Sequence, residues 1–155
     1  MSYLSELRKA VGHRPLLAAG ATVLVVKNGQ ILLNLRADTK TWGIPGGSME
    51  LGETLEEAAR RELLEETNLN AQNLELLHVF SGKPMYFEYP NGDKVHSVAV
   101  LYKAQNVTGE LQIADDESLK LQYFAPDDLP TLESRSEHIL NWVRENRPDV
   151  LRQTR

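Results

Sequence analysis

The N-terminal part of the chain has apolar positions that recur first at helical spacing and then in strand-like runs. A short amphipathic helix ending near Gly12 is predicted by four apolar residues on one face: Tyr3, Leu4, Leu7 and Val11. Two apolar runs follow at residues 21–26 and 31–35, and Asn28-Gly29 stands between them. Such a pair is a strong hairpin signal because both residues accept a positive φ. We therefore predict a helix followed by two paired strands.

Further strands are predicted in the second half of the chain. Their apolar or alternating runs cover residues 74–80, 86–89, 95–102 and 119–124. The sequence Pro90-Asn91-Gly92-Asp93 separates the second and third of these runs and is typical of a turn. These two runs are therefore predicted to form another hairpin.

Two longer helices are predicted by capping residues that precede an apolar stripe. Thr54 and Glu57 form a capping box, followed by an inward stripe of Leu55, Ala58, Ala59, Leu63 and Thr67. Ser134 and Glu137 form a second capping box, ahead of a closing helix that should stop before Pro148.

Helical and strand patterns interleave along the chain, and no repeat, linker or low-complexity tract separates them. Residues 42–47 are rich in glycine and proline and are predicted to form a shaped loop. A length of 155 residues with 41% hydrophobic and 25% charged residues suits one folded core. The prediction is a single mixed α/β domain over residues 1–155.

Composition narrows the chemistry. The absence of cysteine excludes disulfides, thiolate metal ligands and thiol nucleophiles. The formal net charge of −5 argues against binding a nucleic acid duplex, because neutralising many phosphates requires a basic face. Charged residues interrupt the N-terminal segment, so we predict neither a secretory signal nor a membrane span there and expect a cytoplasmic protein. An anionic substrate would then need metal ions to neutralise it.

The helix that begins after Thr54 carries an acidic face. Glu62, Glu65 and Glu66 stand at positions i, i+3 and i+4 and therefore share one side of the helix. Carboxylates this close repel one another by roughly a few tenths of a kcal/mol per exposed pair. A divalent cation would remove that cost, and hard oxygen ligands suit Mg²⁺ or Mn²⁺. The alternative is a solvated face stabilised by glutamate–arginine pairs along the helix, the commoner role of exposed charges.

The stretch from residue 47 to residue 69 resembles the Nudix box of the Nudix hydrolases, the MutT-like family. That pattern is a glycine, five residues, a glutamate, seven residues, Arg-Glu, an apolar residue, any residue, Glu-Glu, any residue, a glycine and an apolar residue. Every defined position matches except the last glycine, which is Asn68 here. Asparagine is the residue that best replaces glycine at a left-handed helix C-cap, so we expect the geometry to be kept.

The resemblance implies an α/β/α sandwich around a mixed β-sheet and a metal-dependent attack of water on phosphorus. Carried over position by position, it makes Glu65 and Glu66 metal ligands, together with the backbone carbonyl of Gly46. Glu62 would bind metal through water or act as the general base, and Arg61 would orient it. Glu53 is expected to support the site and not to act as a catalyst.

Three residues outside the box are further candidates. Family members often add an acidic residue from a late loop, and Glu117 in Asp115-Asp116-Glu117 is chosen as a base or extra metal ligand. An acidic turn is just as often merely solvated. Arg36 at a strand end is expected to contact substrate phosphates, with a plain surface charge as the equal alternative. Trp42 is considered as a contact for the base, although packing against the sheet is the commoner role of a large aromatic residue.

The four histidines, His13, His78, His96 and His138, show no metal-ligand spacing and are expected to be structural or exposed. The expected activity is hydrolysis of the diphosphate linkage of a nucleoside diphosphate derivative. Pro84 and Tyr86 give conflicting hints, because family subgroups carry a proline for ADP-ribose or a tyrosine for dinucleoside polyphosphates. ADP-ribose is favoured, and a nucleoside triphosphate or dinucleoside polyphosphate is the alternative.

Other functional classes fit less well. A binding module without hydrolysis would not need the full glutamate set. The isomerase branch of the family uses a cysteine, and a transcription regulator would need a DNA-binding domain for which the chain has no room. Similar proteins are often dimers, so a homodimer is a further expectation, while no membrane partner is expected.

Overall fold

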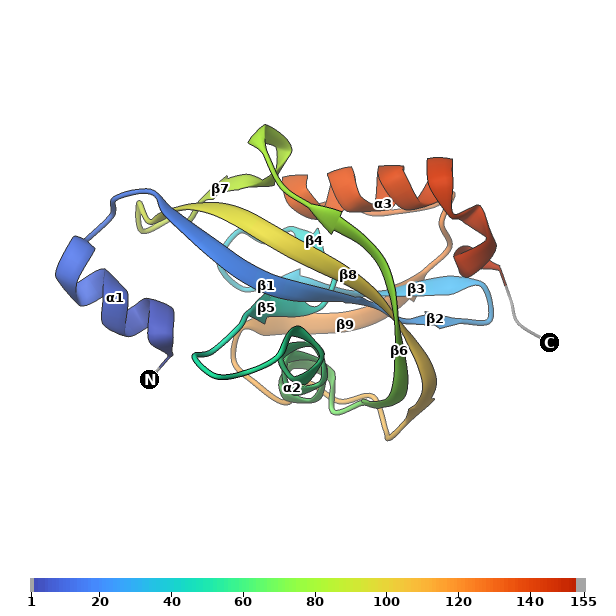
Figure 1. The fold of residues 1–155 in the computed structure, drawn as a ribbon. Coiled ribbons are helices and arrows are strands. Elements are labelled where there is room, and N and C mark those ends of the chain that lie inside the picture. Colours follow the sequence, from blue (N-terminus) through green and yellow to red (C-terminus); the bar gives the residue numbers. More distant parts are fainter. Residues whose placement is uncertain (1, 153–155) are drawn as a thin grey trace.

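The computed structural model describes residues 2–152, and its strands form two sheets that lie between two helices (Figure 1). The first sheet has the order β5 (Gly46–Ser48), β1 (Leu16–Leu24), β8 (Lys94–Thr108) and β6 (Asn70–Phe80), with β7 (Tyr86–Glu88) also paired to β8. The second sheet has the order β2 (Val26–Lys27), β3 (Gln30–Arg36) and β4 (Trp42–Gly43), with β9 (Ser118–Phe124) on β3.

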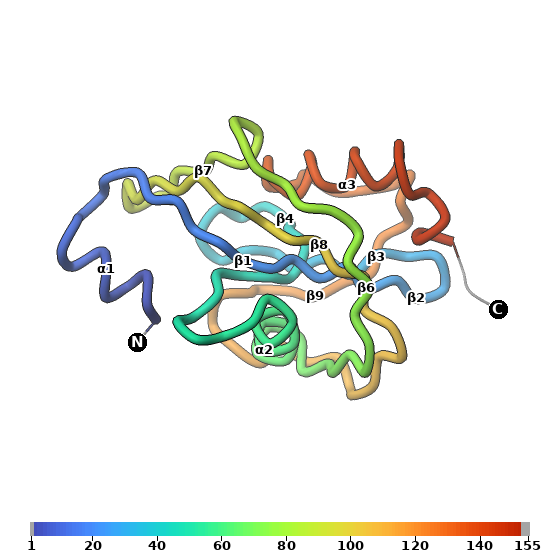
Figure 2. Tube along the Cα trace, in the orientation of Figure 1, coloured from blue at the N-terminus to red at the C-terminus, as the bar shows by residue number. Residues whose placement is uncertain are grey.

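The first sheet is mixed. β1 and β8 run parallel, side by side along the trace in Figure 2, whereas β5, β6 and β7 are antiparallel to their partners. Helix α2 (Leu55–Thr67) lies on one side of the sheets and α3 (Ser134–Asn146) on the other. This arrangement confirms the predicted α/β/α sandwich around a mixed sheet.

The first predicted hairpin is present, but its first run divides between the two sheets. Asn28 and Gly29 take positive φ values of 53° and 73°, as the turn requires, and join β2 to β3. The apolar run predicted as one strand at 21–26 begins earlier, at Leu16, and breaks at Val25. The break lets one continuous run contribute to both sheets; Leu24 before it is buried, whereas Val26 after it is only partly buried.

Strands β6 and β8 extend beyond their predicted bounds. They pair from Asn70↔Thr108 to Phe80↔Ala99, with a register shift between Leu76 and His78. The predicted strands at 74–80 and 95–102 cover only the more apolar part of this ladder. The polar residues beyond these bounds form strand because they pair with the partner strand, and not because they have an apolar pattern of their own.

The helix predictions are largely confirmed. Thr54 caps α2 by accepting a hydrogen bond from Glu57 N, and Asn68 ends it in the left-handed region at φ 66°. The predicted cap of α3 is wrong by one residue: Glu133, and not Ser134, is the N-cap and accepts from Ser136 N. The longer glutamate side chain reaches the free N–H groups from outside the helix, so Ser134 is its first helical residue. Helix α3 ends at Asn146, before Pro148 as predicted.

The remaining elements are short. The predicted N-terminal helix is α1 (Tyr3–Val11), which buries none of its residues, and two 3₁₀ turns are η1 (Lys83–Met85) and η2 (Pro148–Leu151). The apolar core has one cluster on the α3 side, around Leu33 and Leu140, and another on the α2 side, around Val23 and Leu63. Within residues 2–152, no helix is long and apolar enough to cross a membrane.

Candidate active site

Two adjacent glycines allow close packing around β5, Gly46 toward β1 and Gly47 toward α2. Gly46 lies opposite Thr22 in the β1–β5 ladder, and a Cβ at Gly46 would collide with the backbone of Ala21. A Cβ at Gly47 would lie 2.5 Å from the carboxyl carbon of Glu62. The loop predicted at 42–47 therefore holds two short strands, β4 and β5, and brings the acidic face of α2 against the second of them.

The three glutamates on this face differ in exposure. Glu66 is 6% exposed, and its Oε2 accepts a hydrogen bond from Gly46 N at 2.9 Å. Glu62 is partly buried against Gly47, while Glu65 is exposed. The three glutamates share one face of the helix, as predicted, but they are buried to different extents.

Arg61 connects the glutamates with the preceding loop. Its guanidinium donates from Nε and Nη2 to the two carboxylate oxygens of Glu53 at 2.7 and 2.9 Å. Nη1 donates to Glu62 at 2.9 Å and to Glu65 at 3.3 Å, and Nη2 also reaches Ser48 O at 3.0 Å. The contact with Glu62 is the one that the proposed orienting role of Arg61 requires.

Burial dominates the protonation of two of these carboxyls. Burial raises the pKa of Glu62 to about 7, against the opposing hydrogen bond from Arg61, and the charge of Glu65 adds to the rise. Burial and the charge of Glu62 raise the pKa of Glu66 well above its usual range, although Gly46 N opposes this. By contrast, the hydrogen bonds from Arg61 lower the pKa of Glu53. The carboxyls of Glu62 and Glu66 are therefore costly to ionise without a bound cation.

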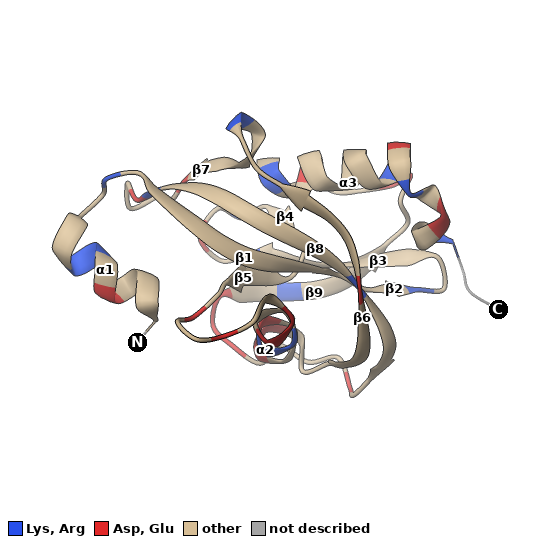
Figure 3. Ribbon diagram, viewed as in Figure 1, with Lys and Arg blue, Asp and Glu red and all other residues tan. Residues whose placement is uncertain are grey.

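A second acidic segment meets α2 at Glu66. Carboxylate oxygens of Glu66, Asp115 and Glu117 all lie within 4.8 Å of one another. The segment before β9 is held by a hydrogen bond from Glu117 N to Asp115 Oδ1 at 3.2 Å, and burial raises the pKa of the Glu117 carboxyl. Figure 3 shows acidic residues in red on α2 and on the segment that leads into β9. The structure therefore adds Asp115 to the predicted candidates.

This group of oxygens suits a hard divalent cation. Mg²⁺ and Mn²⁺ prefer carboxylate ligands, and Mg²⁺ is commonly held by one or two of them with water and phosphate oxygens. A buried carboxyl with a raised pKa, such as that of Glu66, is the kind of group that a cation would stabilise in its ionised form. The residues present therefore fit such an ion.

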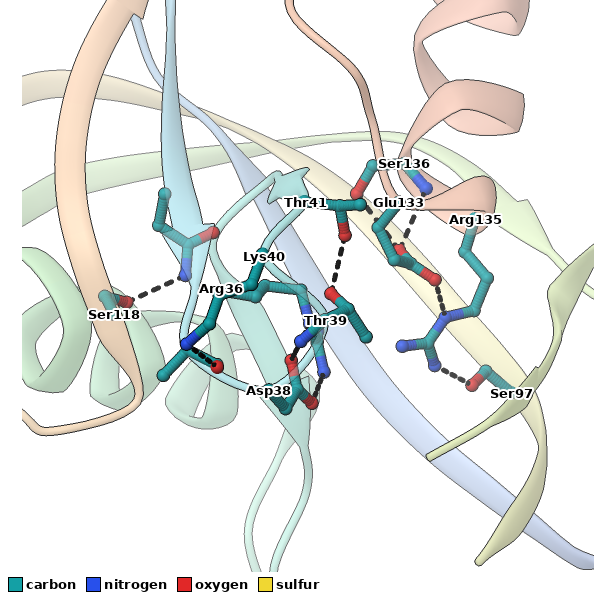
Figure 4. A network of polar contacts seen from close by, with 12 residues as sticks. Arg36, Asp38, Thr39, Lys40, Thr41, Ser97, Ser118, Glu133, Arg135 and Ser136 are labelled. Carbon is teal, nitrogen blue, oxygen red and sulfur yellow. Dashed lines mark hydrogen bonds and ion pairs between the residues drawn. The ribbon is translucent and has the colours of Figure 1, made fainter. Parts of the chain in front are cut away.

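Arg36 and Trp42 lie in the second sheet, at the end of β3 and in β4. Arg36 makes a two-pronged pair with Asp38 (Figure 4). Its guanidinium carbon lies 5.2 Å from the ring centroid of Phe87. Trp42 packs edge-on against Phe124 at 4.8 Å between ring centroids and joins the core cluster below α3. Trp42 thus has a packing partner in the sheet, as its alternative role, packing against the sheet, requires.

A buried polar network nearby was missed by the sequence analysis. Arg135 donates to Glu133 Oε1 at 2.8 Å and to Ser97 Oγ at 2.9 Å (Figure 4). Its guanidinium carbon lies 4.2 Å from the ring centroid of Phe87. The residues of this network come from distant parts of the chain, so no local sequence spacing predicts it. Only the unusual Glu-Ser-Arg sequence at the start of α3 could have drawn attention.

The histidines take other roles. Within residues 2–152, the cluster able to hold a metal contains no histidine. His78 stacks on Trp142 at 4.1 Å between ring centroids, and His13 contacts Asp93 Oδ1 at 2.7 Å.

Comparisons with known proteins agree with this fold. The family model of the NUDIX domain matches residues 14–143. An oxidized purine nucleoside triphosphate hydrolase of Danio rerio is 33% identical over 121 residues, covering 76% of this chain and 72% of that protein. An ADP-ribose pyrophosphatase of Methanocaldococcus jannaschii is also 33% identical over 121 residues, covering 76% of this chain and 67% of its own.

A solved structure agrees as well. The MutT NUDIX hydrolase from Burkholderia pseudomallei superposes with a TM-score of 0.71 at 32% identity, over 83% of this chain and 98% of that one. The sandwich and its acidic helix define a hydrolase of phosphoanhydrides. The chain belongs to the Nudix family, and it is a Nudix pyrophosphohydrolase with MutT-like relatives.

Proposed function

We propose that this enzyme hydrolyses the diphosphate linkage of a nucleoside diphosphate derivative in a reaction that depends on Mg²⁺ or Mn²⁺, with ADP-ribose as the preferred substrate. The observation that carries the proposal is the buried Glu66 carboxyl beside Asp115 and Glu117, whose oxygens lie within 4.8 Å of one another. Ionising the buried Glu66 beside two further carboxylates is costly, and a cation with a substrate phosphate would offset that cost.

Glu66 and Glu117 are the proposed core of the metal site, with Glu65, Glu62 and the backbone carbonyl of Gly46 as the further ligands. Bound divalent metal supplies charge neutralisation at the phosphoryl oxygens and lowers the pKa of water. The chain itself supplies the fixed carboxylates, because Gly46 N orients Glu66 through their hydrogen bond at 2.9 Å.

Glu62 is the proposed general base. A pKa of about 7 allows this carboxylate to accept a proton from water near neutral pH, which an ordinary glutamate does less well. Arg61 holds Glu62 Oε1 at 2.9 Å and so limits the directions in which the carboxylate can point. Glu117 is the second candidate for the base, since burial also raises its pKa.

The proposed substrate contacts are Arg36, through its guanidinium, and Trp42. ADP-ribose is favoured because the relative from Methanocaldococcus jannaschii is an ADP-ribose pyrophosphatase. Pro84 agrees with this choice, whereas Tyr86 is the residue that the resemblance associates with dinucleoside polyphosphates. An oxidised purine nucleoside triphosphate is the second candidate, supported by the equally similar relative from Danio rerio.

The test is phosphate-product release from ADP-ribose, 8-oxo-dGTP, NADH and diadenosine polyphosphates, each with Mg²⁺, with Mn²⁺ and with chelator. Metal-dependent turnover that is fastest for ADP-ribose would support the proposal in full. Faster cleavage of 8-oxo-dGTP would move the substrate to the second candidate. Absence of turnover in a folded protein that still binds nucleotide would support a non-hydrolytic binding module instead.

A further inference from the structure

Arg36 lies next to the acidic site through the backbone. It is the last residue of β3 and pairs with Ser118 of β9 at a register shift. The adjacent backbone bond runs from Ala37 N to Glu117 O at 2.9 Å, so the strand end that carries Arg36 is tied to a proposed metal ligand. The charge of Arg36 also acts on the Glu117 carboxyl, where it opposes the rise of the pKa caused by burial, so the guanidinium lies within electrostatic range of the acidic site.

The guanidinium of Arg36 is restrained on one edge and on one face. Nε donates to Asp38 Oδ1 at 3.0 Å, and Nη2 donates to Oδ2 at 2.8 Å (Figure 4). The guanidinium carbon lies 5.2 Å from the ring centroid of Phe87 and 6.0 Å from that of Tyr89. Across residues 2–152, Nη1 has no hydrogen-bond partner, so this nitrogen is free to donate.

Asp38 is itself fixed by a closed turn. Its Oδ1 also accepts from Thr39 N at 2.7 Å. The turn closes through Arg36 N to Thr41 O at 2.8 Å and Lys40 N to Arg36 O at 3.0 Å. The carboxylate is therefore a rigid support for the arginine and not a mobile counter-ion.

We propose that Asp38 is a positioning residue for substrate, which holds Arg36 so that Nη1 is available to a substrate phosphate. The inference rests on the proposed function, because it needs a phosphate at the acidic site. Holding a long side chain in advance avoids the ordering cost on binding, an effect of about threefold to tenfold in affinity. The negative charge of Asp38 opposes this gain, but both side chains are partly exposed, at 24% and 33%, and solvent weakens their charges.

The chain contains a matched control for this pair. Arg147 and Asp149 have the same spacing and the same two-pronged geometry, with both hydrogen bonds at 3.0 Å, and they lie at the end of α3. Asp38→Asn and Asp149→Asn thus remove the same charge from the same kind of pair. The first pair adjoins the site, and the second does not.

The experiment measures kcat and KM for ADP-ribose and the Kd of ADP, all with Mg²⁺, in both variants. We expect Asp38→Asn to raise KM and the Kd of ADP about threefold to tenfold while kcat changes less than about twofold. Asp149→Asn should leave all three unchanged. In an Arg36→Gln background, Asp38→Asn should have no further effect, because its action passes through the guanidinium.

Three results would overturn the inference. One is an unchanged KM and Kd in Asp38→Asn. Another is an equal rise of KM in the Arg36→Gln background. The third is a fall in kcat and melting temperature without a change in KM, which would mark a merely structural role. In a wild-type enzyme that cleaves ADP-ribose, any of these leaves the proposed function intact, and if turnover is absent the Kd of ADP alone decides.

Discussion

Glu53 holds Arg61 through both of its carboxylate oxygens, at 2.7 Å to Nε and 2.9 Å to Nη2. The same carboxylate also accepts from Glu50 N at 2.9 Å, so the loop before α2 and the helix share one anchor. Arg61 in turn contacts Glu62, the proposed base. We therefore propose that Glu53 supports the site through Arg61.

Replacing Glu53 by glutamine should lower kcat about tenfold to a hundredfold, the usual range for a residue that orients a reacting group. The amide keeps the shape but loses the charge, and one of its two oxygens becomes a donor. Steady-state kinetics on ADP-ribose would measure the effect, with Glu50→Gln in the same loop as the control. Full activity of Glu53→Gln would mean that Glu62 and Ser48 alone keep Arg61 in place.

Glu66→Gln should reduce turnover by several orders of magnitude while the fold stays intact, because the change removes a proposed metal ligand with little change of shape. Glu57→Gln is the matched control, since Glu57 is exposed on the same helix. Kinetics with saturating Mn²⁺ and circular dichroism would be measured together. Near-normal turnover of Glu66→Gln would contradict the assignment of this residue to the metal site.

Alanine at each of the two site glycines should separate catalysis from folding. Gly47→Ala meets the end of the Glu62 side chain at 2.5 Å, which can move aside, so the protein should fold but lose most of its activity. Gly46→Ala meets the backbone of β1, which cannot move easily, so its melting temperature should fall by more than about 5 °C. Thermal melts and activity of the purified variants would be compared. An active Gly47→Ala would show that Glu62 need not stay where it lies.

The metal-free protein should become less stable as pH rises from 5 to 7.5. Glu62 and Glu66 bind protons more tightly in the folded state, since the pKa of Glu62 rises from 4.5 to about 7 and that of Glu66 lies well above 4.5. Their stabilisation is complete below the unfolded pKa and is lost as pH passes through the folded one.

Thermal melts with chelator should therefore give a melting temperature about 5 to 10 °C lower at pH 7.5 than at pH 5. Saturating Mn²⁺ should flatten this slope, because a bound cation stabilises the ionised carboxylates. The Glu66→Gln variant provides the control, since it should show a smaller dependence on pH in chelator. An equal slope with and without Mn²⁺ would argue that the cation does not meet these carboxylates.

Local signals predicted the elements that carry the acidic face. The bounds of α2 follow from Thr54 at one end and Asn68 at the other, both adjacent in sequence to what they cap. The positions of Glu62 and Glu66 follow from helical spacing alone. These features were accessible because each depends on residues within a few positions of one another.

Features that depend on distant partners were not accessible. The Ser97–Arg135 hydrogen bond joins residues 38 positions apart, and no pattern in either segment specifies the other. The C-terminal end of β8 reads as a polar segment, yet it pairs with the start of β6 as far as Asn70. The cap of α3 was misplaced because Ser134 is a common capping residue, whereas the less usual Glu133 reaches the free N–H groups in this tertiary setting.

The parallel pairing of β1 with β8 has a consequence for how the protein folds. Nine positions from Leu16 to Leu24 pair with residues 95 to 103, so the centre of the sheet joins segments almost eighty residues apart. The antiparallel β6–β8 ladder closes a much shorter loop and can form first. During synthesis, β1 therefore emerges long before β8. Its edge toward β8 stays unpaired, and its apolar side chains stay exposed, until β8 is made. Slow pairing of β1 with β8 should limit the folding rate. It should also make the protein prone to aggregation when it is expressed with few chaperones.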